Sequence, residues 1–536
     1  MSIKVFLCCM IRLLLGTATT GQTATFCITR TINNEPCRIV CVCNATTCDT
    51  VQPFNASQLS QGQAVVYTSS QSGQRFNTSA SNFGQINYEN VAVTISIDPT
   101  DMRQRIIGFG GAFTDASGIN IASLPSKAQD ALLQTYFGRD GIEYNIGRIP
   151  IASCDFSTHE YSYDDHDSDF ELSQFSLAEE DYKYKIPYLQ SAMRLSNNSL
   201  RLFGSPWSAP AWMKTSGKMS GNGTLIGAAG DKYHKTWAQY FVKFLAAYAK
   251  QNLSLWGLTV ENEPGAGFVA NYPFQAMGFT GATERNFVKM DLGPALNAGG
   301  YAGVKLMIHD DQRFSAASFA DAIYTDSDAS KFVSGLAVHW YYDPISPIAS
   351  LDYIHTRYPD KFILATEACT GSMPYEIKGP ILGDWLRAEK YASDIIEDLN
   401  HWVSGWVDWN IALDLEGGPN WVNNFVDSPV IVNKTAGEFY KQPMFYAMGH
   451  FSKFVQPGSN IISANTTTNH PIKSVNSQNF ETVAFIRPDN ICGLVILNKN
   501  DTEIRVQITE KASAETLSLK VAARSISTVL WKCLSQ

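Results

Sequence analysis

The sequence predicts an α/β protein: a (β/α)8 TIM barrel with an all-β sandwich domain built from both chain ends and a small disulfide-containing N-terminal segment. Three observations predict this fold. Short apolar stretches alternate with helical patterns through the middle of the chain, strand-like runs occupy both flanks, and five cysteines crowd into residues 27–48.

Eight apolar stretches, each ending in polar or charged residues, are the predicted barrel strands. Between them lie longer amphipathic segments, such as Tyr233–Lys250 and Ala388–Asn400, whose apolar side chains recur at helical spacing. A strand followed by a helix, repeated eight times, is typical of a parallel barrel, which we expect over residues 103–445. The predicted strands are Ile106–Gly111, Tyr144–Pro150, Leu200–Ser205, Leu255–Val260, Val304–His309, Leu336–Trp340, Phe362–Thr366 and Val403–Asp408.

The two flanks contain short β-forming runs separated by Asn, Asp and Gly turns. Because these runs occur on both sides of the barrel, we expect residues 53–102 and 446–536 to form one sandwich. The runs are Ala92–Ile97, Val483–Ile486, Leu494–Leu497, Ile504–Ile508 and Ser525–Leu530.

The first 22 residues have the pattern of a signal peptide: Lys4, an apolar run over residues 5–15, then small and polar residues. The run is much shorter than the roughly 20 residues of a membrane-spanning helix. Nine N-x-Ser/Thr sequons also suit a protein that enters the secretory pathway. They begin at Asn44, Asn55, Asn77, Asn197, Asn222, Asn252, Asn433, Asn465 and Asn500.

The cysteines of residues 23–52 predict disulfides, because small exported segments are commonly held together by them. A zinc site is the alternative, but the C-x₂-C pairs that zinc favours are missing.

Composition excludes some classes of partner. Hydrophobic residues make up 45% and charged residues 17% of the 536-residue chain, which suits a large folded core. The net charge of −9 argues against nucleic acid, whose phosphates require a dense basic surface.

The residues after each predicted strand form a rim of carboxylates and aromatic rings. Catalytic groups of a barrel lie at this end of the strands. Aromatic faces stack on sugar rings, and carboxylates and Asn bind hydroxyl groups, so the rim predicts a carbohydrate site. It contains no metal-ligand cluster and no glycine-rich phosphate loop, and we expect neither a metal nor another cofactor.

Glu263 and Glu367 are the predicted catalytic pair. Glycoside hydrolysis needs one carboxyl to protonate the leaving oxygen and a second to attack or to direct water. Glu263 follows the fourth predicted strand and Glu367 the seventh, so the two lie across the barrel mouth. Retention and inversion both remain open at this point, because they differ in the distance between the carboxyls. A single Glu would also suit a surface ion pair, but the Asn-Glu-Pro setting of Glu263 argues against that.

From about Cys37 to the C-terminus the chain resembles the glucosylceramidases (acid β-glucosidases) of glycoside hydrolase family 30. The motifs that carry the resemblance are Phe109–Asp115, Ser153–Phe156, Ser205–Trp207, Trp212–Thr215, Glu261–Pro264, His339–Tyr341, Thr366–Cys369 and Gly417–Pro429. The resemblance implies a retaining β-glucosidase that converts glucosylceramide to glucose and ceramide through a covalent intermediate. It also implies a lysosomal or secreted protein, peripheral contact with an anionic membrane and a saposin-type activator.

The same resemblance assigns roles to residues. It makes Glu263 the general acid/base and Glu367 the nucleophile. Tyr341 and Arg313 would hold the nucleophile, and Arg148 would pair with a carboxylate. His339 would be a supporting hydrogen-bonding group. The implied glucose-binding residues are Asp155, Trp207, Asn262, Trp409 and Asn424. Tyr272 and Phe274 resemble aromatics that line the mouth where lipid chains would lie.

The resemblance also bears on the cysteines and on the loop after Glu367. The resemblance favours a Cys43–Cys48 disulfide and leaves Cys41 with Cys27 or Cys37 as its partner. Cys154 and Cys369 are expected to be free thiols. Tyr375 stands where relatives carry Trp.

Two alternatives to the predicted function remain. One is a family member that acts on another β-linked sugar, such as a xylan, a β-1,6-glucan or a fucoside. The other is a non-catalytic glycolipid-binding protein on a hydrolase scaffold.

Overall fold

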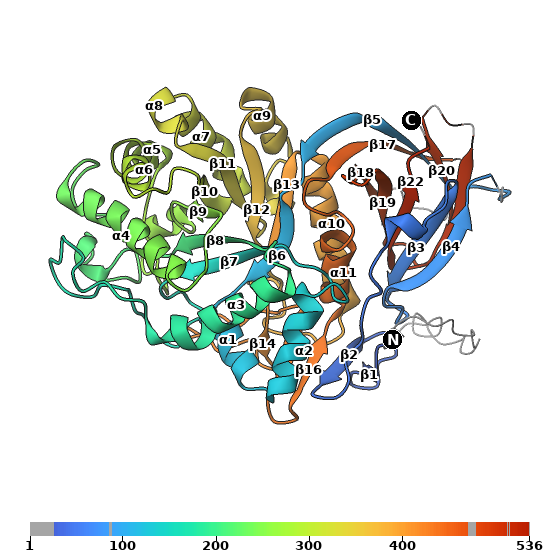
Figure 1. The fold of residues 1–536 in the computed structure, drawn as a ribbon, viewed down its shortest axis with the longest axis horizontal. Coiled ribbons are helices and arrows are strands. Elements are labelled where there is room, and N and C mark those ends of the chain that lie inside the picture. Colours follow the sequence, from blue (N-terminus) through green and yellow to red (C-terminus); the bar gives the residue numbers. More distant parts are fainter. Residues whose placement is uncertain (1–25, 85–87, 470–478, 512, 514, 535–536) are drawn as a thin grey trace.

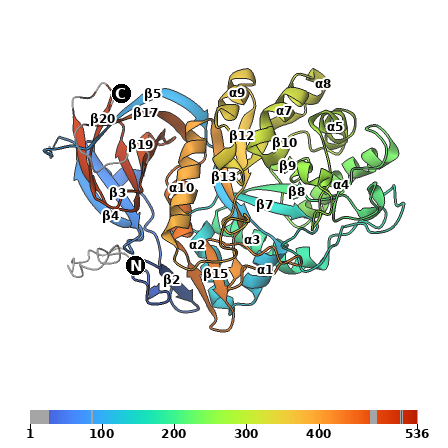
Figure 2. The ribbon, with the colours of Figure 1, turned by 180° about the vertical axis from the view of Figure 1, so that it is seen from behind.

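The computed structural model describes residues 26–84, 88–469, 479–511, 513 and 515–534. The predicted signal peptide lies outside these residues. Figure 1 shows a barrel ringed by helices on one side and a β-sheet domain on the other, with α10 and α11 between them. Figure 2 shows the same arrangement from behind.

The barrel is closed and entirely parallel, as predicted. Its strands follow the order β10-β11-β12-β13-β6-β7-β8-β9. All eight predicted strands are present, and their ends differ from the prediction by at most three residues. They are β6 (Gly108–Ala112), β7 (Ile146–Ile151), β8 (Arg201–Pro206), β9 (Gly257–Thr259), β10 (Lys305–Gln312), β11 (Val333–His339), β12 (Phe362–Glu367) and β13 (Val403–Asn410).

Largely apolar runs form these strands because both faces of a barrel strand are covered. Every residue of β7 and β13 is buried. Neighbouring strands also approach closely at glycine: a Cβ on Gly110 would lie 1.8 Å from the carbonyl oxygen of Ile146. Side chains are therefore excluded at that point, and glycine is required by packing.

Helices cover the barrel and complete its core. The helix α10 begins after Asp384, whose side chain accepts a hydrogen bond from the Leu386 amide at 2.7 Å. None of the described helices is long and apolar enough to cross a membrane. The helices are α1 (Asp115–Ala122), α2 (Ser126–Phe137), α3 (Ile186–Leu195), α4 (Lys232–Ala249), α5 (Gly281–Phe287), α6 (Gly293–Ala298), α7 (Arg313–Tyr324), α8 (Ser327–Ser330), α9 (Ala349–Arg357), α10 (Trp385–Asn400) and α11 (Pro443–Ser452).

The second domain is a nine-stranded sheet with the order β21-β20-β5-β17-β18-β19-β22-β3-β4. Strands from both ends of the chain pair within it, as the sequence predicted: β22 pairs with β3, and β17 pairs with β5. A Cys492–Cys533 disulfide, which was not predicted from the sequence, joins β19 to the residue after β22. The strands are β3 (Gln63–Ser70), β4 (Asn77–Asn82), β5 (Val93–Arg105), β17 (Asn460–Thr468), β18 (Phe480–Ile486), β19 (Ile491–Asn498), β20 (Ile504–Glu510), β21 (Thr516–Val521) and β22 (Ser525–Lys532).

The N-terminal segment joins a small sheet of its own. Its β1 (Thr29–Thr31) and β2 (Ile39–Asn44) pair with each other, and β2 also pairs with β16 (Glu438–Lys441). The strands β15 (Val430–Asn433) and β14 (Leu413–Asp414) complete this sheet. The segment is thus fastened to residues that follow the last barrel strand.

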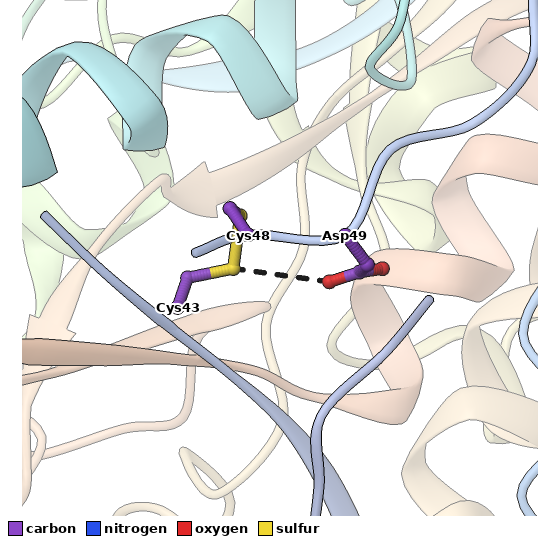
Figure 3. A group of neighbouring side chains, drawn as sticks. All are labelled: Cys43, Cys48 and Asp49. Carbon is purple, nitrogen blue, oxygen red and sulfur yellow. Dashed lines mark hydrogen bonds between the residues drawn. A yellow bond between two sulfur atoms is a disulfide. The ribbon is translucent and has the colours of Figure 1, made fainter. Parts of the chain in front are cut away.

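The predicted Cys43–Cys48 disulfide is confirmed, and Cys41 is bonded to Cys27. Figure 3 shows the first of these bonds with Asp49 beside it; Asp49 Oδ1 lies 3.8 Å from Cys43 Sγ. Bonded sulfurs are not thiolates, and only thiolates bind zinc well, so the zinc alternative is excluded at this pair.

Candidate active site

A cavity of about 1090 Å³ opens at the carboxyl ends of the barrel strands. It gathers ten of the residues that the sequence predicted as a site. These are Asp155, Trp207, Asn262, Glu263, Tyr272, Phe274, Tyr341, Glu367, Trp409 and Asn424. Arg148 and His339 lie directly behind the cavity wall and contact its carboxylates.

Glu263 projects from a left-handed backbone position, with φ of 44°. It lies beyond the end of β9 and begins a short 3₁₀ helix, Pro264–Phe268. Its Oε1 accepts a hydrogen bond from Gln312 Nε2 at 2.7 Å and lies 3.1 Å from His339 Nδ1. Its Oε2 lies 3.3 Å from the Tyr272 hydroxyl. Oε1 of Glu263 therefore has two nitrogen partners, whereas Oε2 has the Tyr272 hydroxyl as its neighbour.

Glu367 is the last residue of β12 and is held by different groups. The Tyr341 hydroxyl donates to Oε1 at 2.7 Å, and the Arg148 guanidinium donates to Oε2 in a buried ion pair. Arg148 also donates to Asn262 Oδ1 and to Asp310 Oδ2, each at 2.8 Å. A buried guanidinium that binds several oxygens fixes their relative positions, so Arg148 ties Glu367 to Asn262 across the cavity floor.

The two glutamates face each other at close range. One carboxylate oxygen of Glu263, one of Glu367 and one ring nitrogen of His339 all lie within 4.8 Å of one another. Three such atoms have the spacing of metal ligands, but both ring nitrogens of His339 already face carboxylates, Glu263 on one side and Asp310 on the other, at 3.0 Å. The His339 imidazole therefore bridges two carboxyl groups by hydrogen bonds.

Charge balance among Arg148, His339, Asp310, Glu263 and Glu367 determines how many protons the carboxyl groups hold. Burial lowers the pKa of His339, but Glu367 and Asp310 outweigh it and raise that pKa to about 10. Burial opposes the charge of Asp310, yet Arg148 and His339 lower its pKa overall. Two cations thus face three carboxyl groups. The set is neutral when Glu263 and Glu367 together carry one proton, which is the state a general acid and an anionic partner require.

The position of that proton can be tested through His339. Burial raises the pKa of Glu367, while His339 and Arg148 act in the opposite direction. A His339→Asn variant loses a positive charge beside Glu367, which favours the protonated form of that carboxyl. We expect the acidic limb of the profile of kcat/KM against pH to move upward by about one pH unit. An acidic limb that stays in place would show that His339 carries no charge.

Aromatic rings and an acid form another part of the cavity wall. The indoles of Trp207 and Trp409 stack at 5.1 Å between ring centroids, and both are almost fully buried. Asp155 accepts hydrogen bonds from Asn424 Nδ2 at 3.1 Å and Asn420 Nδ2 at 3.2 Å. Burial raises the pKa of Asp155 to about 7 although these amides act against it. An indole platform beside an acid with fixed oxygens is suited to a ring that carries hydroxyl groups.

One predicted contact is absent. Arg313 was expected to hold Glu367, but it is the first residue of α7 and its guanidinium points to another group of acids. Its partners are Asp343, Glu397 and Asp398. Arg148 makes the contact with Glu367 instead. Arg148 reaches Glu367 from β7, three strands away in the barrel order, whereas Arg313 follows β10, only two strands away, and turns to other acids.

Some functional neighbours were not assigned a role from the sequence. Gln312 and Asp310 lie at the end of β10 and contact Glu263 and His339, and Asn420 lies in the Gly417–Pro429 motif. Their positions at a strand end or inside a quoted motif were the available signals. Cys154 and Cys369 are free and buried beside the cavity, as expected.

A TIM barrel with two facing carboxyls at its mouth, beside stacked indoles, defines a glycoside hydrolase. Comparison with protein families agrees. Residues 106–455 match the glycosyl hydrolase family 30 TIM-barrel domain, and residues 458–529 match the family 30 beta sandwich domain. The chain therefore belongs to glycosyl hydrolase family 30.

Two relatives match along nearly their whole length. "Putative glucosylceramidase 4" of Caenorhabditis elegans is 46% identical over 497 residues, which cover 92% of this chain and 93% of the relative. "Lysosomal acid glucosylceramidase" of Mus musculus is 45% identical with the same coverage. Among solved structures, SrfJ from Salmonella typhimurium has a TM-score of 0.78 at 27% identity and covers 88% of this chain and 99% of that one.

Proposed function

We propose that this glycoside hydrolase is a retaining β-glucosidase that cleaves glucosylceramide into glucose and ceramide. Glu263 is its general acid/base and Glu367 its nucleophile. One observation carries the proposal: carboxylate oxygens of the two residues approach within 4.8 Å. Retaining enzymes separate their carboxyls by about 5–5.5 Å, whereas inverting enzymes need about 6.5–9.5 Å to admit a water molecule.

In the first step Glu367 attacks the anomeric carbon while Glu263 gives its proton to the departing oxygen. Arg148 and Tyr341 hold Glu367 at both oxygens, which orients it and favours its ionised form against the effect of burial. Because His339 and Gln312 occupy Oε1 of Glu263, the transferable proton is placed on Oε2. The bond from carbon to the leaving oxygen breaks as the bond from carbon to Glu367 forms.

In the second step water releases the sugar. Glycosylation removes the charge of Glu367, and Glu263, which has given up its proton, then acts as a base toward the attacking water. Asp155, Trp207, Asn262, Trp409 and Asn424 bind the glucose in both steps. Similarity to proteins named glucosylceramidase supports glucose as the sugar.

The outer part of the cavity supports a lipid leaving group. Tyr272 and Phe274 pack edge to face, at 4.6 Å, on its wall. Phe268, Val269 and Phe314 line the mouth and are each at least half exposed. Exposed apolar side chains around a cavity suit contact with a lipid surface. We therefore propose peripheral contact with an anionic membrane and, by family resemblance, a saposin-type activator and a lysosomal location.

Covalent trapping tests the proposal most directly. We expect a gluco-configured cyclophellitol-type epoxide to label the purified protein once, with the mass shift on the peptide that contains Glu367. A single label there supports a covalent mechanism and recognition of glucose together. The matched xylo-configured reagent is the control for sugar choice: faster labelling by it would indicate another β-linked sugar. A folded protein that no reagent labels between pH 4 and 7 would favour the glycolipid-binding alternative.

A further inference from the structure

Four acids surround Arg313 at a distance from the catalytic pair. Arg313 Nε lies 3.2 Å from Asp343 Oδ1, and Nη1 lies 3.1 Å from Glu397 Oε1 and 3.5 Å from Asp398 Oδ1. A carboxylate oxygen of Asp394 lies within 4.8 Å of those of Asp343 and Asp398. We call these four acids and Arg313 the Arg313 cluster. One guanidinium cannot neutralise four ionised carboxylates.

Nearby cations do not make up the deficit. Lys390 faces the cluster from α10, but its ammonium is paired with Glu376 at 2.7 Å and lies over the ring of Trp340. Lys499, from the turn after β19, is paired with Glu481. Both line the same solvent-connected cavity of about 560 Å³ as Asp343, Asp394 and Glu397. Protons from solvent can therefore reach the cluster and supply the missing positive charge.

The cluster joins two parts of the barrel rim. Asp343 lies on the segment that follows β11, and Asp394, Glu397 and Asp398 lie on α10. Arg313 binds both parts, and it also donates to the carbonyl oxygen of Asp343 at 3.1 Å. Only two residues before Asp343, the Tyr341 hydroxyl donates to Glu367. The path of this segment, and with it the position of Tyr341, depends on contacts made by the cluster.

We propose that the Arg313 cluster is a proton-dependent clamp that holds the segment Tyr341–Asp343, and thereby Tyr341 on Glu367, when its acids are protonated and loosens it when they ionise. The effect on turnover rests on the proposed function, whereas the clamp itself does not. Arg313 is thus a positioning residue for Tyr341 and has no contact with the reacting atoms.

The direction of the pH effect follows from the cluster's acids. Burial raises the pKa of Asp343 to about 8, although the charge of Arg313 acts to lower it. Burial also raises the pKa of Asp394 to about 6, although the hydrogen bond from the Trp406 indole and the charge of Arg313 act to lower it. The pKa of Asp398 is also raised, by burial and then by Asp394 and Asp343. These folded-state values exceed the unfolded value of about 3.9, so the protonated clamp contributes stability that is lost as the pH rises from about 4 to 8.

A neutral, isosteric pair of substitutions separates charge from shape. In an Asp394→Asn/Glu397→Gln variant, Asn can still accept the Trp406 indole N–H, and Gln can still accept from Arg313. Amide hydrogen exchange of the peptide over residues 340–346, corrected for the intrinsic effect of pH, measures the clamp without substrate. We expect about tenfold less protection at pH 7.5 than at pH 5.0 in the wild type, and a difference below about twofold in the variant.

Two outcomes would overturn the proposal. Equal protection at the two pH values in the wild type overturns the clamp, and so does a variant that keeps the wild-type difference. A Glu503→Gln variant, which removes a surface carboxylate from the sheet domain, should behave as the wild type. If the variant does not fold, Glu397→Gln alone, at a half-exposed side chain, is the second test and should reduce the difference. If hydrogen exchange depends on pH as expected but the protein has no glucosidase activity, the clamp is supported and the proposed function is wrong. If the protein has glucosidase activity but its hydrogen exchange does not depend on pH, the proposed function is supported and the clamp is wrong.

Discussion

A Glu367→Gln variant should lose at least about 10⁴-fold in kcat/KM on glucosides, because an amide neither attacks the anomeric carbon nor forms a stable glycosyl intermediate. Glutamine has the shape of glutamate and can still accept the hydrogen bond from Tyr341. Binding of substrate should therefore remain while turnover disappears. Steady-state kinetics on a nitrophenyl glucoside and calorimetric titration with a glucoside inhibitor measure the two effects separately.

The control for this variant is Glu416→Gln, which changes an exposed acid on the loop after β14 and should leave kcat/KM within about twofold of the wild type. Turnover above about 1% of wild type in purified Glu367→Gln protein would remove Glu367 as the nucleophile. A wild-type protein that binds glycolipid as tightly as the variant and turns over no faster would be a binding protein. Added azide should restore some turnover in a Glu367→Ala variant and give the α-glucosyl azide, because the smaller side chain leaves room for azide to attack directly.

Much of this architecture could be predicted because burial leaves a pattern in sequence. Barrel strands such as β7 and β13 are covered on both faces, and they appear as short runs with few polar residues. The catalytic carboxyls could be predicted for a related reason. Glu263 and Glu367 follow strands four and seven, and every parallel strand of a barrel delivers its last residues to the same mouth.

The partners of long side chains could not be predicted in the same way. Arg148 lies within β7 and Arg313 follows β10, and nothing in their spacing tells which one turns toward Glu367. The answer depends on the path of the segment after β11, which brings Asp343 to Arg313. The Cys27–Cys41 bond likewise depends on how β1 folds back on β2, where Thr29 lies opposite Cys41. Loop paths of this kind are set by tertiary packing and not by local periodicity.

A Glu263→Gln variant should be impaired in a way that depends on the leaving group. For a glucoside with an alkyl or ceramide alcohol, the loss of the acid should lower kcat/KM by about 10²–10⁴-fold. For a dinitrophenyl glucoside, whose leaving group departs without a proton, the first step should be much less affected and the glucosyl-enzyme should accumulate. Gln312 and His339 remain to hold the new amide in place.

Azide distinguishes this defect from loss of the nucleophile. Azide is already an anion and needs no base, so it should speed turnover of the dinitrophenyl glucoside by the Glu263→Gln variant, and the product should be the β-glucosyl azide. Two inversions, one at Glu367 and one at azide, give that configuration. The α-azide from this variant would mean that no covalent intermediate forms. In that case the two carboxyls, although within 4.8 Å in this structure, would have to separate to admit water, and the enzyme would invert.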